Sequence, residues 1–304
     1  MWGYSDARQA LRDALRLSRA MTFKSAVADL PLGGGKGVIM IAPGAVLSAE
    51  LRTAALLDFG DTVESLGGRY IAAEDVGTSS RDMRLIAQRT QHVAGLPARM
   101  GGSGDPSPFT ALGVESAIRA CCERVYGSSS LRDRSVAVVG LGHVGSRVAK
   151  RCARAGARLV VGDIDRGKRK LADELGADWL EPKAALEADV DVVAPCALGG
   201  VLNHETVPRL RCRIVAGAAN NQLAGDSVAG LLSAREILWA PDFVVNAGGI
   251  INIAEELNGY DAGAARRRVR QIGEILLEIF DRANGSGVSP LAAAMDLAAA
   301  RLRV

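Results

Sequence analysis

A lysine in a run of glycines is the first feature of this sequence that could do chemistry. Residues 30–37 read LPLGGGKG, and Lys36 lies near the end of that run. Glycine lets the backbone approach a bound molecule closely and adopt dihedral angles that other residues avoid. Because partial burial would lower its pKa, a lysine held there could accept and donate protons near neutral pH. Lys36 is therefore a candidate for acid and base chemistry.

The same segment does not match a phosphate-binding loop. That motif requires G-x-x-x-x-G-K followed by Ser or Thr. Here Leu30 occupies the first glycine position, and Gly37 follows Lys36 where the hydroxyl residue should stand. Phosphoryl transfer is therefore disfavoured.

Two other charged residues could join Lys36. Lys24 ends the predicted helix before the glycine run, and Asp75 lies in AAEDVG, at the end of a predicted strand. Active sites of α/β proteins gather at such strand ends. If the two ammonium groups were close, each would lower the pKa of the other, and one could hold a carboxylate. The alternatives are two solvated surface lysines and an aspartate that caps a turn.

A second motif predicts a dinucleotide site. The stretch SVAVVGLGHVG carries Gly140, Gly142 and Gly145 in the spacing G-x-G-x-x-G, after a predicted strand and before a predicted helix. Asp163 ends the next predicted strand, about 20 residues further on, where an acidic residue binds the adenosine ribose. A carboxylate there favours NAD over NADP, although Arg166 lies nearby. The alternative is a Rossmann-like domain with a decayed or different nucleotide site.

The elements that must position these residues alternate between helix and strand, which predicts an α/β protein. In the first hundred residues we expect helices over 5–21, 49–66 and 80–93 and strands over 37–42 and 69–77. A loop or hinge is expected over 99–108, and long helices over 109–127, 264–287 and 289–304. We predict a Rossmann-type NAD-binding domain and a smaller α/β catalytic domain with a cleft between them. The expected bounds are 1–108 with 281–304 for the catalytic domain, 109–127 for a connecting helix, 128–262 for the NAD-binding domain and 263–280 for a returning helix.

Composition excludes several classes of protein. The 37 basic and 34 acidic residues nearly balance, which argues against nucleic acid or a membrane surface as partner. The basic stretch ARRRVR at 265–270 is interpreted as a solvated helix face. The five cysteines show neither a CxxC pair nor a zinc pattern, so we expect no metal and a reduced, cytoplasmic compartment. We also expect neither a signal peptide nor a transmembrane span.

At this point the motifs carry a resemblance to a known family. They are MTFKSAVADLPLGGGKGVI, YIAAEDVG, GGSGDPSPFTALGV, GLGHVG, APCALGGVLN, AGAANNQL and APDFVVNAGGIINIAEE. Together and in this order, they resemble the leucine/phenylalanine/valine branch of the Glu/Leu/Phe/Val amino-acid dehydrogenase superfamily. Relatives carry a further stretch before the equivalent of MWGY. The resemblance implies an enzyme that oxidises an L-amino acid with NAD to its 2-oxo acid and ammonia, reversibly.

The resemblance also implies a role for each matching residue. Lys24 would hold the substrate carboxylate, Lys36 would be the general acid and base, and Asp75 would carry protons to and from the amino group. The substrate side chain would lie against Ala73, Ile250 and Ile253. Thr110 would contact the nicotinamide carboxamide, Asn221 would lie by the nicotinamide and the substrate, and Asn246 would lie beside the cofactor. Further cofactor contacts are expected from His143, Val144, Cys196 and Ala197, beside the three motif glycines and Asp163.

The apolar residues of this side-chain pocket would leave a glutamate carboxylate unpaired, so glutamate is disfavoured. Leucine, valine or isoleucine is favoured, and an aromatic substrate, phenylalanine or tryptophan, is the alternative. The three histidines lie outside the lysine and aspartate motifs, which makes a 2-hydroxy-acid dehydrogenase the weaker interpretation. A catalytically inactive NAD-binding protein is the alternative of another class. A homo-oligomer, dimer or larger, is expected.

Overall fold

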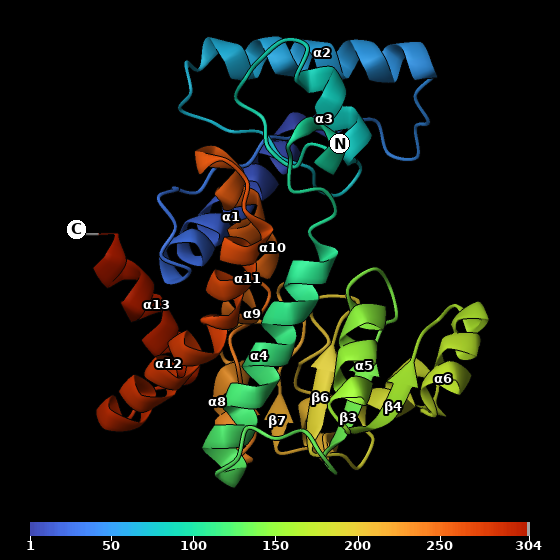
Figure 1. Ribbon diagram of the computed structural model, residues 1–304, viewed down its shortest axis with the longest axis vertical. Coiled ribbons are helices and arrows are strands. Elements are labelled where there is room, and N and C mark those ends of the chain that lie inside the picture. Colours follow the sequence, from blue (N-terminus) through green and yellow to red (C-terminus); the bar gives the residue numbers. More distant parts are fainter. Residues whose placement is uncertain (303–304) are drawn as a thin grey trace. The chain divides into compact units, whose positions relative to one another are not determined.

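The computed structural model describes residues 1–302, except for the side chain of Asn258, and its contacts divide the chain into two compact units (Figure 1). The first unit comprises Met1–Pro106 and Ile250–Ala265, and the second comprises Ser107–Gly249 and the chain from Arg266. Across residues 1–302, no helix combines the length and the apolar character that a membrane crossing requires.

A six-stranded parallel sheet organises the second unit. Its strand order is β5-β4-β3-β6-β7-β8. The chain therefore runs from the central β3 to the edge strand β5, returns to the centre at β6 and continues to the opposite edge at β8. This is the order of the doubly wound dinucleotide-binding fold, in which ligands bind where the strand order reverses. The strands are β3 (Ser135–Val139), β4 (Arg158–Gly162), β5 (Asp178–Trp179), β6 (Val192–Pro195), β7 (Ile214–Val215) and β8 (Leu238–Trp239).

Helices cover both faces of this sheet, because side chains along a strand point alternately to opposite faces. Ala137 of β3 packs in a buried cluster with Leu186 and Leu232 from helices on one face. Val138, its neighbour, points to the other face, where α4 and α5 lie (Figure 1). The helices of this unit are α4 (Ser107–Tyr126), α5 (Gly145–Arg154), α6 (Arg169–Leu175), α7 (Pro182–Leu186), α8 (Val228–Ala234), α9 (Asp242–Val245), α12 (Ile272–Ser286) and α13 (Pro290–Arg301).

The first unit combines helices with a short sheet of two parallel strands. Asp6 begins its first helix, because the Asp6 side chain accepts a hydrogen bond from the backbone N–H of Gln9 at 2.8 Å. The core of the unit contains Leu56, Val63, Ala72, Met83 and Ile86. Its elements are β1 (Trp2–Gly3), α1 (Ala7–Val27), β2 (Met40–Ile41), α2 (Ala49–Ser65) and α3 (Ser80–Ile86), while α10 (Gly248–Ala254) and α11 (Ala262–Arg270) each cross a boundary between the units.

The glycine run before Lys36 packs tightly against its own unit. A Cβ atom on Gly34 would lie 2.0 Å from Thr22 Oγ1 and 2.3 Å from the Ser18 carbonyl oxygen of α1. A Cβ on Gly35 would lie 2.7 Å from the Tyr70 ring. None of the glycines at 33–35 and 37 has a positive φ. The expectation of unusual dihedral angles is therefore wrong, and at these two positions the absent side chain is what allows close packing.

Replacing Gly34 by alanine is expected to lower the free energy of unfolding by about 1–3 kcal/mol, the usual cost of overpacking. The new methyl group would collide with backbone atoms of α1, which cannot turn aside as a flexible side chain can. Gly33→Ala is the matched control, because no atom lies within 4 Å of its added Cβ. Urea denaturation of both variants checks this, and equal midpoints would contradict the packing described.

Several elements differ from the sequence-based expectation. The helix predicted over 5–21 extends to Val27, and the strand predicted over 37–42 is reduced to Met40–Ile41. The strand predicted over 69–77 is reduced to one bridge, Ala72 with Val93, because the chain turns directly afterwards. The helix predicted over 80–93 ends at Ile86, since the following residues turn to bring Val93 to that bridge. The helix predicted over 264–287 is divided at Gln271 into α11 and α12.

The compact units also differ from the predicted domain bounds. Residues 281–304 were expected with the catalytic domain, whereas the contacts group the chain from Arg266 with the Rossmann-type sheet. The reason is packing, since α12 lies against α4 and α13 lies against α12. Conversely, Ile250–Ala265 joins the first unit. The predicted α/β class is confirmed, with a Rossmann-type second unit and a smaller first unit.

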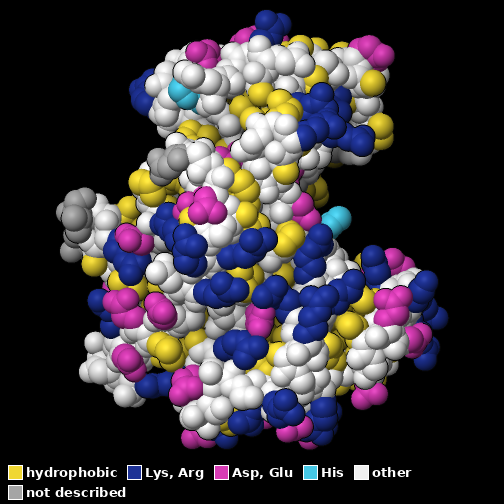
Figure 2. Space-filling view, viewed as in Figure 1, with side chains coloured by type: hydrophobic (Ala, Val, Ile, Leu, Met, Phe, Trp, Pro, Cys, Tyr) yellow, Lys and Arg dark blue, Asp and Glu magenta, His cyan; other side chains and the backbone are white. Residues whose placement is uncertain are grey.

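The basic stretch at 265–270 forms most of α11. Ala265 and Val269 are buried, while Arg266, Arg267 and Arg270 are exposed, as expected for a solvated helix face. Figure 2 shows Lys and Arg side chains over α4 and α5 with Asp and Glu side chains between them. Glu115 of α4, for example, pairs with Arg119 at 2.9 Å and Arg151 at 2.5 Å.

Candidate active site

Lys36 and Asp75, the two residues predicted to do the proton chemistry, meet in the first unit. Lys36 Nζ forms an ion pair with Asp75 Oδ2. The Lys36 side chain is 19% exposed, whereas that of Asp75 is 50% exposed. A largely buried amine therefore lies beside a carboxylate that water can reach.

Burial disfavours the charged form of the Lys36 amine. Burial lowers the pKa of Lys36 below its ordinary value, and the negative charge of Asp13 on α1 partly offsets this. Asp13 is held in place by Tyr4, whose hydroxyl donates to Asp13 Oδ2 at 2.6 Å, and by Arg16 at 2.8 Å. The hydrogen bonds from Tyr4 and Arg16 keep the pKa of Asp13 low, so its carboxylate stays charged.

Asp13 and Tyr4 were missed by the sequence analysis. Both lie in ordinary positions, one on a helix and one at the end of β1, and neither belongs to a glycine-rich motif. Tyr70 was also missed, although its hydroxyl accepts a hydrogen bond from the N–H of Gly37 at 2.9 Å. The available signals were that Tyr70 falls in the strand predicted over 69–77 and that Tyr4 directly precedes the helix predicted over 5–21.

Replacing Asp13 by asparagine is expected to move the acid limb of the kcat/KM pH profile to lower pH. Asp13 raises the pKa of Lys36, so its neutralisation lets the amine lose its proton at lower pH. Activity as a general base rises through that pKa. Asp6→Asn is the matched control on the same helix, because asparagine also caps a helix well. An unmoved acid limb in the Asp13 variant would refute this coupling.

Four of the predicted substrate-binding residues also lie in the first unit, whereas the fifth, Asn221, lies in the second. Lys24 is half-buried in the last turn of α1, directly before buried Ser25. Ala73 is half-buried next to the bridge residue Ala72. Ile250 and Ile253 are half-buried and lie on one side of α10, because residues three apart on a helix are neighbours. Their contacts with a substrate remain predictions.

The glycine motif after β3 has the geometry that a dinucleotide requires. Gly140 has a φ of +100°, and a Cβ there would lie 2.6 Å from Ala197. A Cβ on Gly145 would lie 1.8 Å from the Gly140 carbonyl oxygen, so these two glycines close the turn and seat α5. Gly142 has no atom within 4 Å of its added Cβ, which leaves open space at the position where a pyrophosphate would approach.

The remaining predicted cofactor residues belong to the same unit. Asp163 accepts hydrogen bonds from the N–H groups of Leu141 at 2.5 Å and Asp165 at 2.8 Å, which joins it to the glycine loop. Arg166, which left the choice between NAD and NADP open, pairs with Glu181 at 3.2 Å. The other positions lie as follows: His143 and Ala197 are exposed, Thr110, Val144 and Cys196 are half-buried, and burial raises the pKa of the Cys196 thiol to about 11.

Two asparagines complete this set. Asn246 is 7% exposed, and its Nδ2 donates to Asn220 Oδ1 at 2.7 Å and to the Ala218 carbonyl oxygen at 3.1 Å. Its Oδ1 is buried without a partner, so an acceptor is left for a donor such as a carboxamide. Asn221 is exposed with a φ of +51°, and its carbonyl accepts from the N–H of Gly200 at 2.7 Å. The residues present fit an NAD molecule.

Known protein families match residues in both units. The family Glu/Leu/Phe/Val dehydrogenase, dimerisation domain, matches residues 4–92, and Glutamate/Leucine/Phenylalanine/Valine dehydrogenase matches residues 161–282. Residues 117–200 also match the NAD binding domain of D-isomer specific 2-hydroxyacid dehydrogenases. The last match overlaps the glycine motif.

Individual relatives extend over nearly the whole chain. Leucine dehydrogenase of Thermoactinomyces intermedius is 41% identical over 305 residues, covering 100% of this chain and 82% of the relative. L-tryptophan dehydrogenase of Nostoc punctiforme is 43% identical over 302 residues (98% and 83%), and valine dehydrogenase of Streptomyces albus is 41% identical over 306 residues (98% and 82%). The crystal structure of the Nostoc enzyme matches with a TM-score of 0.85, covering 99% of this chain and 85% of that one.

The doubly wound sheet with its glycine-rich turn lies in the second unit, and the paired lysine and aspartate lie in the first. With the named relatives, these features identify an NAD-dependent amino-acid dehydrogenase. The chain belongs to the Glu/Leu/Phe/Val dehydrogenase family, as the motifs predicted.

Proposed function

We propose that this chain catalyses the reversible NAD-dependent oxidative deamination of an apolar L-amino acid to its 2-oxo acid and ammonia. The observation that carries the proposal is the ion pair between Lys36 and Asp75, in which Lys36 is largely buried. Relatives at about 40% identity over the full chain include leucine and valine dehydrogenases. NAD is the cofactor, and it would be held by Gly140, Gly142, Gly145 and Asp163.

In the oxidative direction, bound NAD⁺ supplies the acceptor for the hydride that leaves the substrate α-carbon. Lys24 would hold the substrate carboxylate by charge. Asp75 would first take a proton from the substrate ammonium group. After oxidation has produced an iminium, neutral Lys36 would take a proton from the water that attacks it. Asp75 then returns its proton to the nitrogen, the hydroxyl group of the water adduct loses its proton to solvent, and the C–N bond breaks to release ammonia.

The chemistry balances with water as the only co-reactant besides NAD⁺. The amino acid loses two electrons and a proton as hydride, and the carbonyl oxygen of the product comes from water. The products are the 2-oxo acid, ammonium, NADH and one proton. The lowered pKa of Lys36 suits this task, because a base must be neutral to accept the proton from water.

The side-chain preference is part of the proposal. Ala73, Ile250 and Ile253 would form an apolar pocket, and two isoleucines suit leucine, valine or isoleucine. An aromatic L-amino acid is the second candidate, because the tryptophan dehydrogenase relative is 43% identical. One methylene group in such a pocket discriminates by only about 1–3 kcal/mol, so mixed specificity is expected.

We also propose a homo-oligomer in the cytoplasm. The oligomer is supported by the match of residues 4–92 to a family described as a dimerisation domain. The compartment is supported by the five cysteines, which are all free thiols.

The experiment that tests the function is a panel of 2-oxo acids with ammonia and NADH, followed by NADH consumption and product identification. The expected result is reductive amination of the leucine, valine and isoleucine keto acids, with 2-oxoglutarate inactive. Turnover of phenylpyruvate or indolepyruvate ahead of these would favour the aromatic candidate. If the chain binds NAD but turns over no 2-oxo acid of the panel, the alternative of a non-catalytic NAD-binding protein is supported.

A further inference from the structure

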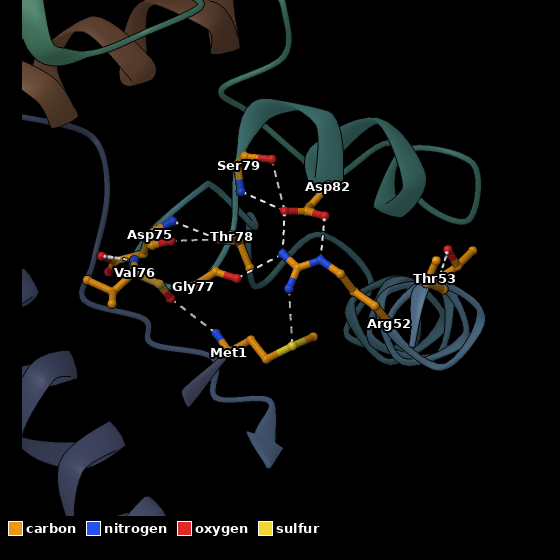
Figure 3. Close-up of polar contacts among 10 residues, drawn as sticks. Met1, Arg52, Thr53, Asp75, Val76, Gly77, Thr78, Ser79 and Asp82 are labelled. Carbon is orange, nitrogen blue, oxygen red and sulfur yellow. Dashed lines mark hydrogen bonds and ion pairs between the residues drawn. The ribbon is translucent and has the colours of Figure 1, made fainter. Parts of the chain in front are cut away.

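The turn that carries Asp75 is tied down from outside by an arginine of α2. Arg52 Nη2 donates to the Gly77 carbonyl oxygen at 2.9 Å and to Asp82 Oδ2 at 2.7 Å, while Arg52 Nε donates to Asp82 Oδ1 at 3.2 Å (Figure 3). The planar guanidinium therefore bridges two points, the turn and the first turn of α3. Lysine could not reproduce this fork.

Arg52 and Asp82 together form a clamp on the turn. Asp82 is buried, and both of its carboxylate oxygens accept hydrogen bonds. It is 7% exposed and lies at the third position of α3. Besides Arg52, Asp82 Oδ2 accepts hydrogen bonds from Ser79 N–H at 2.8 Å and from Ser79 Oγ at 2.9 Å. The carboxylate thus fixes the residue that ends the turn and the start of α3 together.

Hydrogen bonds within the turn fix the orientation of the Asp75 side chain. The Asp75 carbonyl accepts from Thr78 N–H and Thr78 Oγ1, both at 2.8 Å. Asp75 Oδ1 accepts from the N–H of Val76 at 2.7 Å, so its other oxygen, Oδ2, is the one that pairs with Lys36. A shift of the Gly77 carbonyl would rotate this turn and carry Oδ2 away from Lys36.

We propose that Arg52, held by Asp82, is a positioning residue that fixes the Asp75–Ser79 turn and thereby aims the Asp75 carboxylate at Lys36. The inference rests on the proposed function and extends it to two residues that lie in helices and touch neither Lys36 nor the glycine run. An orienting role of this kind has a large effect because a misplacement of about 1 Å can cost roughly 100-fold in rate.

The charged groups around Lys36 allow the positioning role of Arg52 to be tested by a measurement that does not depend on catalytic activity. They are Asp75 in the turn, Asp13 on α1 and the Met1 ammonium group, whose pKa is lowered by burial, by Arg52 and by Lys36. If Asp75 moves away, Lys36 loses a negative neighbour and should release its proton at lower pH. Labelling with acetic anhydride at a series of pH values, followed by mass spectrometry, reports that midpoint for Lys36.

The test compares Arg52→Gln, Arg52→Lys and a matched control. The control is Arg89→Gln, because Arg89 also pairs with α2, through Asp61 at 3.8 Å, and both partners are half-exposed. For Arg52→Gln we expect kcat to fall at least tenfold, KM for the amino acid to change less than threefold, and the Lys36 labelling midpoint to move to lower pH. Arg52→Lys should recover part of kcat, and the control should match the wild type.

Each outcome decides the proposal. A lower melting temperature for Arg52→Gln, with kcat per folded molecule and the labelling midpoint unchanged, would overturn it and leave a purely structural clamp. If Arg52→Gln does not fold, Arg52→Lys carries the same two readouts. A wild-type chain without turnover would refute the proposed function, yet a shifted midpoint in the variant would still support the clamp.

Discussion

Lys36→Met is expected to reduce kcat by about 100- to 10,000-fold, the usual contribution of a general acid and base. The methionine side chain is apolar and only one atom shorter than that of lysine, but it cannot accept a proton from water. NAD affinity should stay within about twofold of the wild type, because the cofactor residues belong to the other unit. The measurement is NADH formation from L-leucine, with NAD binding followed separately.

The same substitution should not destabilise the protein at neutral pH. The pKa of Lys36 in the fold lies below its ordinary value of 10.5, so the fold disfavours the charged amine. This unfavourable contribution is fully present below the folded pKa and disappears as pH rises toward 10.5, because the unfolded chain then binds more protons. Removing the charge therefore leaves the free energy of unfolding at pH 7 unchanged or higher.

Lys24→Met is the comparison variant for the Lys36 substitution. Lys24 is proposed to hold the substrate carboxylate, so its loss should mainly raise KM for the amino acid. Equal losses of kcat in the two variants would mean that the two lysines do not divide binding and proton transfer. Wild-type kcat in Lys36→Met would remove Lys36 from the mechanism.

Gly142→Val is expected to raise the dissociation constant for NAD at least about tenfold while leaving the melting temperature of the NAD-free protein unchanged. A Cβ on Gly142 meets no protein atom within 4 Å, so the fold has room for the new side chain. That room is where a pyrophosphate would approach the backbone. Titration with NADH, followed by fluorescence, gives the dissociation constant.

Gly145→Ala is the contrasting variant within the same motif. Its added methyl group would lie 1.8 Å from the Gly140 carbonyl oxygen and 3.0 Å from Cys196 Cβ, so the loop itself must shift. We expect a clear loss of stability in the absence of NAD. If Gly142→Val bound NAD as the wild type does, the open space at Gly142 would not be part of the cofactor site.

The sequence predicted the second unit well because one short motif determines much of its geometry. Three glycines at fixed spacing, a strand before them and an acid after the next strand require a parallel sheet with a crossover helix. The structure has that arrangement around β3, α5 and β4. Short edge strands such as β5, of two residues, carry too little pattern to predict their bounds.

The first unit was harder to predict because its contacts join residues that are far apart in the chain. Lys36 and Asp75 could be singled out by their unusual neighbours in sequence. Arg52 and Asp82 could not, since each lies within a helix with no unusual neighbours in sequence, and only the fold brings them within 2.7 Å. Likewise, an apolar face on residues 281–304 predicts burial but not the surface against which the helices pack.

The glycine run illustrates the same limit. Its composition correctly indicated close approach of the backbone to something, and a ligand was the partner expected. The structure instead places α1 against Gly34 and the Tyr70 ring against Gly35. Both arrangements need glycine, so composition alone could not distinguish them.

The most direct test of the account is the stoichiometry of a single reaction, NAD⁺ with L-leucine, in the wild type and in Lys36→Met at equal NAD occupancy. We expect equal amounts of NADH, 4-methyl-2-oxopentanoate and ammonium from the wild type, and a rate at least about 100-fold lower from the variant. NADH formation at the wild-type rate by Lys36→Met would contradict it.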